Sequence, residues 1–204
     1  MGKAKPIILS AIILAAGKSV RMGRPKQLMP LGESTILEQT IDKVLNSRVD
    51  EVIVVLGYRA EEIRKSIARK IIKVGINPHY RQGMSTSVAA GLGLINDRAK
   101  AVMLVLGDQP FVPSQTIDDL IATFSLSDKG IAIPTYEGQR GNPVIFSAKY
   151  REELLELTGD VGGKEIISRH PDDVLEVAVG SDGINQDIDN MDDYRSHLNR
   201  SPEG

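Results

Sequence analysis

The stretch Ile-Ile-Leu-Ser-Ala-Ile-Ile-Leu-Ala-Ala-Gly-Lys-Ser-Val-Arg-Met-Gly-Arg-Pro-Lys, residues 7–26, joins an aliphatic run to a loop rich in glycine and positive charge. Continuous aliphatic runs such as Ile7–Leu14 are typical of parallel strands covered on both faces. Because Lys3 and Lys5 precede it, the run also resembles a short signal peptide. It is too short to span a bilayer and leads directly into the polar loop. We therefore expect a buried strand in a cytoplasmic protein.

Aliphatic runs and helical patterns alternate along the rest of the chain. The further strand candidates are Glu51–Leu56, Ile71–Val74, Ala101–Leu106, Gly130–Ile133, Val144–Phe146 and Val174–Val177. The helical patterns lie at Thr35–Leu45, Ala60–Lys70, Ser85–Ile95, Ser114–Phe124, Lys149–Leu157 and Gly163–Arg169. This alternation predicts a three-layer, Rossmann-like α/β fold, with a mostly parallel sheet and helices on both faces. Right-handed crossovers then bring the strand-to-helix loops to the carboxyl edge of the sheet, and an acidic loop, Asp187–Asp193, follows the last strand.

Composition limits the classes of function. The 204 residues fit a single domain, 1–204, and a net charge of −2 gives no basic surface for nucleic acid. No cysteine is present, which excludes disulfides, a thiolate nucleophile and a zinc–thiolate site. The histidines, His79, His170 and His197, lie far apart and lack metal-ligand spacing. A site for a charged ligand must therefore be built locally.

The loop after the first strand carries such a site. It contains two glycines and four cations: Gly17, Gly23, Lys18, Arg21, Arg24 and Lys26. Small residues let backbone N–H groups approach a ligand, and Arg and Lys side chains beside them suit a triphosphate. The alternative is a solvated turn with chance charges.

Two familiar nucleotide motifs are not present. Gly17-Lys18-Ser19 resembles the end of a Walker A loop, but Ile12 stands where that loop needs its first glycine. Gly91-Leu-Gly93 resembles a dinucleotide fingerprint, but Asn96 stands where the third glycine is required. A P-loop NTPase and a simple nicotinamide enzyme are therefore not supported.

Carboxylates at two places suggest a metal site. Asp108 ends the most hydrophobic interior strand, where ligands bind in doubly wound folds. In Asp187-Ile-Asp189, alternation along an extended segment puts both carboxylates on one side. Such a segment could bring a carboxylate opposite Asp108, where two carboxylates would repel each other without a cation. The alternatives are that Asp108 caps a turn and that the later segment is a solvated acidic loop.

The segment Arg81-Gln-Gly-Met-Ser-Thr-Ser87 opens a helix. Gly83 allows close approach of the backbone, and a helix N-terminus can hold a phosphate or the edge of a base. A purely structural N-cap is equally compatible with these residues.

Together these motifs resemble the molybdenum cofactor cytidylyltransferase family, within the larger group of guanylyl- and sugar-nucleotide transferases. The matching residues are Leu14-Ala-Ala-Gly17, Ser19, Arg21, Met22, Gly23, Lys26, Gln82–Ser87, Gly107-Asp-Gln-Pro110, Arg140-Gly141, Pro143, Gly159-Asp160 and Asp187-Ile-Asp189. The resemblance implies a nucleotide-diphospho-sugar transferase type of fold. It also implies a nucleotide-binding half, about 1–112, and an acceptor-binding half, about 113–204.

The resemblance assigns roles to individual residues. Its implied nucleotide-binding residues are Leu14, Ala15, Ala16, Gly17, Arg21, Lys26, Gly83, Met84, Ser85 and Asp108. Among these, Arg21, Lys26 and Asp108 would be catalytic, and Asp108 and Asp189 would hold Mg²⁺, with Mn²⁺ as the alternative. The implied acceptor-binding residues are Gln109, Arg140, Gly141, Asn142, Pro143, Gly159, Asp160 and Lys164. The chain departs from the family pattern at Asn142, Gly163-Lys164 and Asn190-Met191.

The implied reaction joins CMP from CTP to the terminal phosphate of molybdopterin, or the molybdenum cofactor, and releases pyrophosphate. A phosphate oxyanion is ionised at neutral pH, so the acceptor needs no strong general base. The expected partners are these substrates and an apo molybdenum hydroxylase, with no nucleic acid and no membrane. The alternatives are a sugar-phosphate nucleotidyltransferase, a guanylyltransferase, and a carrier that delivers finished cofactor to an oxidoreductase.

Overall fold

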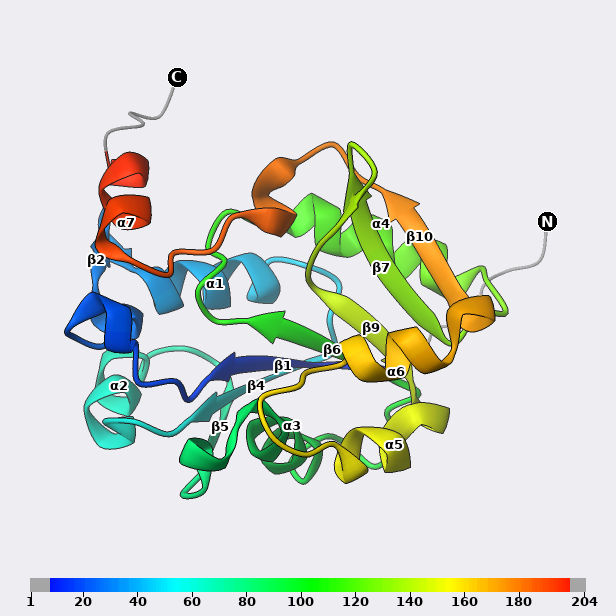
Figure 1. Ribbon diagram of the computed structural model, residues 1–204, viewed down its shortest axis with the longest axis horizontal. Coiled ribbons are helices and arrows are strands. Elements are labelled where there is room, and N and C mark those ends of the chain that lie inside the picture. The colour runs from blue at the N-terminus through cyan, green and yellow to red at the C-terminus, as the bar shows by residue number, and fades with distance from the viewer. Residues whose placement is uncertain (1–7, 199–204) are drawn as a thin grey trace.

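The computed structural model describes residues 8–198, which form one large sheet flanked by helices (Figure 1). Its strands run in the order β10-β7-β9-β6-β1-β4-β5, and β8 pairs with β7. Their bounds are β1 (Leu9–Ala15), β4 (Glu51–Leu56), β5 (Lys73–Ile76), β6 (Ala101–Leu106), β7 (Ile131–Tyr136), β8 (Gln139–Arg140), β9 (Val144–Ser147) and β10 (Val174–Ala178). A second, two-stranded sheet pairs β2 (Pro30–Leu31) with β3 (Ser34–Thr35). Ile7, the first residue of the predicted leading strand, lies outside the described residues.

The sheet is mostly parallel, as predicted. The strand β1 is central and pairs in parallel with β4 and β6, in registers that place Leu14 beside Val55 and Leu106. The exceptions are β9, which runs antiparallel between β6 and β7, and the short β8, which is antiparallel to β7. The carboxyl ends of β1, β4 and β6 therefore meet at one edge of the sheet, where the glycine-bearing loop and Asp108 begin.

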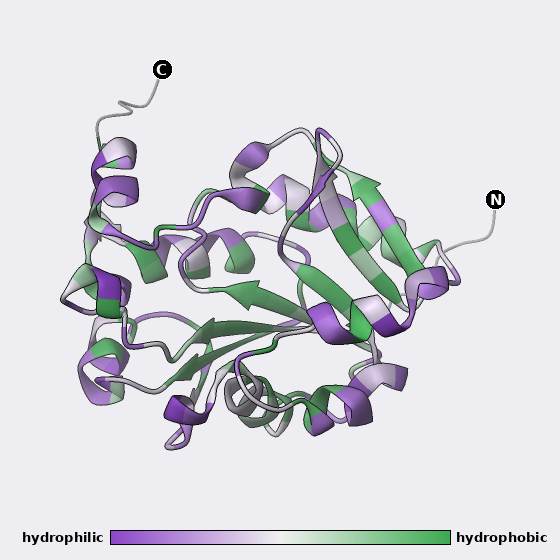
Figure 2. Ribbon diagram, viewed as in Figure 1, coloured by the Kyte–Doolittle hydropathy of each residue, from purple (hydrophilic) through white to green (hydrophobic). Residues whose placement is uncertain are grey.

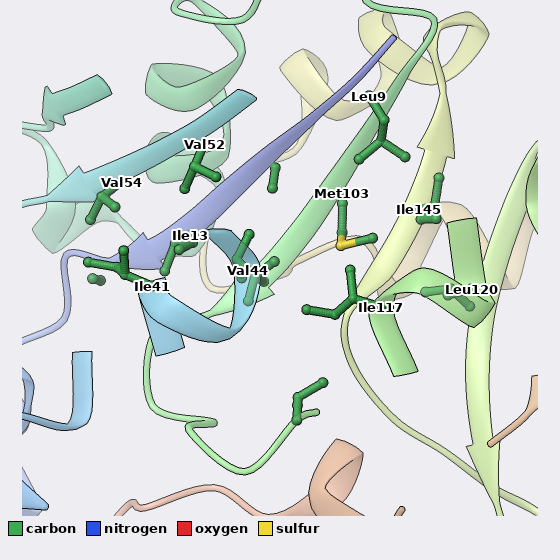
Figure 3. Packing of buried hydrophobic residues seen from close by; sticks show 14 of the residues in the cluster. Leu9, Ile13, Ile41, Val44, Val52, Val54, Met103, Ile117, Leu120 and Ile145 are labelled. Atoms are coloured by element: carbon green, nitrogen blue, oxygen red, sulfur yellow. The ribbon is translucent and has the colours of Figure 1, made fainter. Parts of the chain in front are cut away.

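Helices cover both faces, which confirms the three-layer α/β class. The first face packs against α1 (Ile36–Leu45), α2 (Ala60–Ser66) and α4 (Ser114–Ser125), and the second against α3 (Met84–Leu92), α5 (Arg151–Glu156) and α6 (Lys164–Arg169). Alternate residues of β1 enter different clusters: Ile13 packs with Ile41 and Val44 of α1 (Figure 3), whereas Ile12 faces Val88 of α3. Both faces of β1 are thus buried, which explains its continuous aliphatic run and the apolar colour of the central strands in Figure 2.

Local signals determine where several elements begin and end. Thr35 and Glu38 form the predicted capping box at the start of α1. The predicted helix Ala60–Lys70 is too long, because α2 ends at Ser66 and turns follow. The predicted strand Ile71–Val74 is likewise wrong at its start, because Ile71 is 92% exposed and β5 begins two residues later.

The predicted acidic loop Asp187–Asp193 is wrong in its last three residues, which begin a helix, α7 (Met191–Leu198). Acidic side chains in its first turn suit the positive end of the helix dipole. This helix packs beside β2 (Figure 1) in a third apolar cluster, which lies outside the two faces of the large sheet. Within residues 8–198, no helix combines the length and the apolar character needed to cross a membrane.

A partly exposed charge cluster joins the amino end of β10 to the segment before α5. The carboxylate of Asp173 accepts hydrogen bonds from the Tyr150 hydroxyl and, at 2.8 Å, from Lys149 Nζ. Burial alone raises the pKa of a carboxyl group, but these contacts and the Gly130 N–H outweigh it and lower the pKa of Asp173 from 3.8 to about 2. The charged form of Asp173 is therefore favoured by folding.

We predict that Asp173→Asn makes unfolding less dependent on pH in acid. The wild-type contribution of Asp173 is complete above pH 4 and is lost as the pH falls towards 2, because the folded protein then binds a proton less readily than the unfolded chain. At neutral pH the variant should lose about 1–2 kcal/mol, a range reduced for the partial exposure of the group. Denaturant unfolding from pH 2 to 7 measures both effects.

The matched control is Asp172→Asn, because Asp172 is an exposed carboxylate on the preceding residue. If Asp172→Asn reduced the pH dependence of unfolding as much as Asp173→Asn, the stabilising role of the Asp173 carboxylate would be wrong. It would also be wrong if Asp173→Asn unfolded like the wild type at every pH.

Candidate active site

A cavity of about 500 Å³ opens at the carboxyl edge of the sheet, beside the ends of β1 and β6. Nine of the ten predicted nucleotide-binding residues line it: Leu14, Ala15, Ala16, Gly17, Arg21, Lys26, Gly83, Met84 and Asp108. The tenth, Ser85, is buried immediately behind Met84 in the first turn of α3. The fold therefore brings this predicted set to one place, and the roles of its members remain predictions.

The loop on one side of the cavity is held by a residue that the sequence reasoning missed. Gln27 is 3% exposed, and its Nε2 donates hydrogen bonds of 3.0 Å to the carbonyls of Ala15 and Gly17. The hydroxyl of Ser19 accepts a 3.1 Å bond from the Lys26 N–H. Gly23 ends a short 3-10 helix with a φ of 68°, a left-handed conformation that favours glycine. These contacts fix the backbone from which Arg21 and Lys26 project.

Lys26 brings together the two predicted metal ligands. Its ammonium group bonds to the Asp108 carboxylate and, at 2.8 Å, to Oδ1 of Asp189. The guanidinium group of Arg21 lies 2.9 Å from Oδ2 of Asp189. The Lys26 and Asp108 side chains are only 15% and 19% exposed, so their charges are poorly screened by solvent.

This arrangement changes the expected electrostatics of the aspartates. Burial favours neutral Lys26, but the two carboxylates outweigh it and raise the pKa of Lys26 above 10.5. Burial also favours protonated Asp189, but Lys26 and Arg21 outweigh it and lower the pKa of Asp189. The expectation that Asp108 and Asp189 repel each other without a metal is therefore wrong, because Lys26 lies between them and Arg21 adds a second positive charge at Asp189. An Asn substitution at either position removes an ion pair rather than a repulsion.

The start of α3 is already occupied by another loop of the protein. The Met84 N–H donates to Oδ1 of Asp160, and the Ser85 N–H donates to the Gly159 carbonyl, both at 3.2 Å. Gly83 has a φ of 115°, and a Cβ there would lie 2.2 Å from the Gly159 carbonyl group. The helix terminus predicted to hold a phosphate or base thus meets Gly159 and Asp160, which were predicted to face the acceptor.

Two further residues on the α3 side were not identified from the sequence. Asn77 is 2% exposed, and its Nδ2 donates to the hydroxyls of Thr86 and Ser87 at 2.8 and 3.0 Å. Tyr80 lines the cavity and packs so closely on Gly57 that a Cβ there would lie 2.6 Å from the Tyr80 side chain. A buried asparagine before Pro78 gives no periodic signal, so only the fold reveals these contacts.

A second cavity, of about 400 Å³, contains most of the predicted acceptor residues. They are Gln109, Arg140, Gly141, Asn142 and Lys164. Pro143 follows Asn142 through a cis peptide bond and does not line the cavity, while Asp160 lines the first one. Asp187 lines both cavities, so they adjoin there.

Asp187 lies where the two cavities adjoin. It accepts a hydrogen bond from Nε2 of Gln109, whose side chain is 3% exposed. Burial raises the pKa of Asp187, and the nearby carboxylates of Asp108 and Asp189 raise it further. Asp187 therefore has weaker charge compensation than Asp189, which two cations contact.

The cationic loop and the facing aspartates, at the carboxyl edge of an α/β sheet, suit the binding of a nucleoside triphosphate, as in a nucleotidyltransferase. The chain belongs to the family of the MobA-like NTP transferase domain, whose model matches residues 11–174. The predicted family resemblance is thereby confirmed.

Proteins similar to this chain differ in their named activities. The molybdenum cofactor cytidylyltransferase of Escherichia coli K12 is 30% identical over 196 residues, which cover 96% of this chain and 98% of that protein. The nicotine blue oxidoreductase of Paenarthrobacter nicotinovorans is 24% identical over 94% of this chain and 97% of its own. The crystal structure of Rv0371c from Mycobacterium tuberculosis H37Rv aligns with a TM-score of 0.83 and 33% identity, covering 94% of this chain and 98% of that one. Another structure of Rv0371c is a complex with manganese, with a TM-score of 0.81 and 32% identity over 95% of this chain and 99% of that one.

We predict that Lys26→Ala lowers kcat/KM for the nucleotide by about 30- to 1,000-fold, equivalent to about 2–4 kcal/mol of transition-state stabilisation. The variant loses a preorganised cation beside the cavity and leaves two carboxylates facing each other. Steady-state kinetics measure the first effect, and thermal unfolding of the metal-free protein should show a lower Tm from the second.

Lys18→Ala is the matched control, because Lys18 belongs to the same loop but is exposed and does not line the cavity. If Lys26→Ala kept a near-wild-type kcat/KM, or if Lys26→Ala and Lys18→Ala lost kcat/KM equally, Lys26 would have no specific role in the reaction.

Proposed function

We propose that this protein transfers CMP from CTP to the terminal phosphate of molybdopterin or the molybdenum cofactor and releases pyrophosphate. The observation that carries the proposal is the pair of cavities that meet at Asp187. A transferase that joins two phosphorylated molecules needs adjoining sites with the reacting phosphates between them. The 30% identity to a cytidylyltransferase over nearly the whole chain supports the choice of substrates.

In this proposal the first cavity holds CTP. The backbone of Ala15, Ala16 and Gly17 lines the nucleotide, because small residues let the main chain approach it closely. Gly83 and Met84 lie towards the base and ribose, with Ser85 buried behind them. The cations Arg21 and Lys26 contact the triphosphate, since they are the two that line this cavity.

The second cavity holds the acceptor. Amide side chains from Gln109, Asn142 and Asn185 line it and can both donate and accept hydrogen bonds, as a polar heterocycle requires. Arg140 and Lys164 supply positive charge for a phosphorylated molecule. The cavity also has an apolar side formed by Ile133, Val144, Ile167 and Ile184. Mixed polar and apolar lining is typical of small-molecule sites.

The transfer requires positioning and charge neutralisation more than acid–base chemistry. An oxygen of the acceptor phosphate forms a bond to the α-phosphorus of CTP, and the bond from that phosphorus to the bridging oxygen of pyrophosphate breaks. The attacking oxygen is ionised at neutral pH, so no side chain has to remove its proton. Arg21 and Lys26 offset the negative charge that develops on pyrophosphate.

The residues present fit a divalent cation. Oδ1 of Asp108 is buried and has no hydrogen-bond partner among the described residues, and the Lys26 ammonium stands between Asp108 and Asp189 as a cation would. These two carboxylates would hold Mg²⁺ or Mn²⁺, which prefer oxygen ligands and supply charge neutralisation for phosphate oxygens. Lys26 is then free to turn towards the triphosphate. The manganese complex of Rv0371c supports this part of the proposal.

We predict that pyrophosphate is released rapidly only when CTP, molybdopterin and Mg²⁺ or Mn²⁺ are all present. CTP should be preferred over GTP, because the Ala15-Ala16-Gly17 opening resembles that of cytidylyltransferases. The measurement is pyrophosphate release over a panel of four nucleoside triphosphates, with molybdopterin and several sugar phosphates as acceptors, and with the dinucleotide product identified by mass.

Other outcomes of the panel would contradict the proposal in distinct ways. Equal or better turnover with GTP would overturn the nucleotide, and turnover with a sugar phosphate alone would overturn the acceptor. Tight binding of finished cofactor without pyrophosphate release would indicate a carrier for a molybdenum oxidoreductase. The catalytically impaired Lys26→Ala protein is the control for background hydrolysis.

A further inference from the structure

The helix α7 is tied to the backbone of Asp189 by a reciprocal cap. Oδ2 of Asp193 accepts hydrogen bonds from the N–H groups of Asp189 and Asn190, at 3.0 and 3.2 Å. In return, Oδ1 of Asn190 accepts bonds from the N–H groups of Asp192 and Asp193, at 2.8 and 2.9 Å. The Asp193 carboxylate thus fixes the main chain of Asp189, whose side chain contacts Lys26 and Arg21.

The same helix is anchored to the rest of the protein through Tyr194. This side chain is 7% exposed, and its hydroxyl donates a 2.6 Å hydrogen bond to the carbonyl of Pro30 in β2. A buried tyrosine with a satisfied hydroxyl makes a rigid contact, because both its ring and its polar atom are constrained. Figure 1 shows α7 lying beside β2 at the end of the molecule that carries the cationic loop.

An apolar cluster connects this anchor to each charged segment of the site. Its buried members are Met22, Met29, Leu31, Ile36, Ile188 and Tyr194. Met22 follows Arg21, and Ile188, which is fully buried, precedes Asp189. The Ile188 N–H also donates to the Asp108 carbonyl at 3.1 Å. Arg21 and Asp189 therefore project from positions whose neighbours are packed together against α7.

From these contacts we infer that α7 positions the catalytic centre, with Asp193 and Tyr194 as positioning residues that act through Asp189. The inference rests on the proposed role of Asp189 as a ligand of a divalent cation. An extended segment of chain has many conformations, so a carboxylate on it binds a cation weakly unless its backbone is fixed beforehand. The Asp193 cap and the Tyr194 anchor supply that constraint without touching the substrate.

The test compares two neighbouring carboxylates of α7. Asp193→Ala removes the bonds to the Asp189 and Asn190 N–H groups. Asp192→Ala is the matched control, because Asp192 has the same charge in the same helical turn, but its side chain is 92% exposed and contacts Arg195 at 3.3 Å. Both variants lose the same favourable interaction with the helix dipole, so a difference between them reports the cap.

The measured quantity is the Kd of Mn²⁺ at a fixed CTP concentration, from electron paramagnetic resonance of free Mn²⁺, with the Mn²⁺ bound by CTP alone measured in a titration without protein and subtracted. The measurement needs no acceptor. We expect Asp193→Ala to raise this Kd at least fivefold and Asp192→Ala to change it less than twofold. In an Asp189→Asn background the effect of Asp193→Ala on the Kd should disappear. If Asp193 acts through the Asp189 carboxylate, the effects of the two substitutions are not additive. Asp193→Asn, which keeps an acceptor oxygen, should recover most of the affinity.

A second variant covers the possibility that Asp193→Ala does not fold, as judged by its Tm. Tyr194→Phe keeps the ring and loses only the hydrogen bond to Pro30, and it should raise the Kd of Mn²⁺ about two- to threefold. A purely structural role would lower the Tm but leave the Kd of the folded protein unchanged, and that result would overturn the inference.

The remaining outcomes separate the two proposals. If Asp193→Ala matches Asp192→Ala while Asp189→Asn weakens Mn²⁺ binding, the inference about α7 is wrong and the metal role of Asp189 stands. If the Asp193→Ala effect persists at full size without the Asp189 carboxylate, α7 does not act through Asp189, which also overturns the inference. If Asp189→Asn itself leaves Mn²⁺ binding unchanged, the proposed metal role fails and the inference fails with it.

Discussion

The contact of the Lys26 ammonium with Asp108 and Asp189 holds the functional edge of the sheet together. It joins a loop after the first strand to residues 82 and 163 positions further along the chain. Two largely buried carboxylates without a cation would repel each other and lose the solvation that water gives them. Lys26, with Arg21 as a second cation at Asp189, compensates these charges where the cationic loop, the end of β6 and the segment before α7 meet.

That same compensation links the fold to the proposed chemistry. A position that already accommodates one positive charge between two carboxylates suits a divalent cation without rebuilding the backbone, and the displaced lysine remains within the cavity that phosphates would enter. Gln27 holds the loop on one side, and the Asp193 cap holds the Asp189 backbone on the other. The protein thus keeps its charged groups preorganised by hydrogen bonds to their backbone, which is how electrostatic catalysis avoids reorganisation during the reaction.

Patterns local in sequence predict much of this structure. The bounds of β4 and β6 match the predicted runs because both strands are buried on both faces. The helix α7 is missed because only Tyr194 of its residues is buried, so it has no apolar stripe. The contact of Asp160 with Met84 spans 76 positions and depends on a loop meeting a helix terminus, which spacing cannot reveal. Sequence reasoning placed Asp108 and Asp189 at one edge but not Lys26 between them, because ion-pair geometry depends on the assembled fold.

A crystal structure with CTP and Mn²⁺, measured at the manganese absorption edge, would reveal whether a metal ion replaces Lys26 between the two aspartates. We expect an anomalous peak between the carboxylates of Asp108 and Asp189, with Lys26 Nζ turned from them to the triphosphate oxygens. A manganese peak elsewhere, with Lys26 still bonded to both aspartates while CTP is bound, would contradict this expectation.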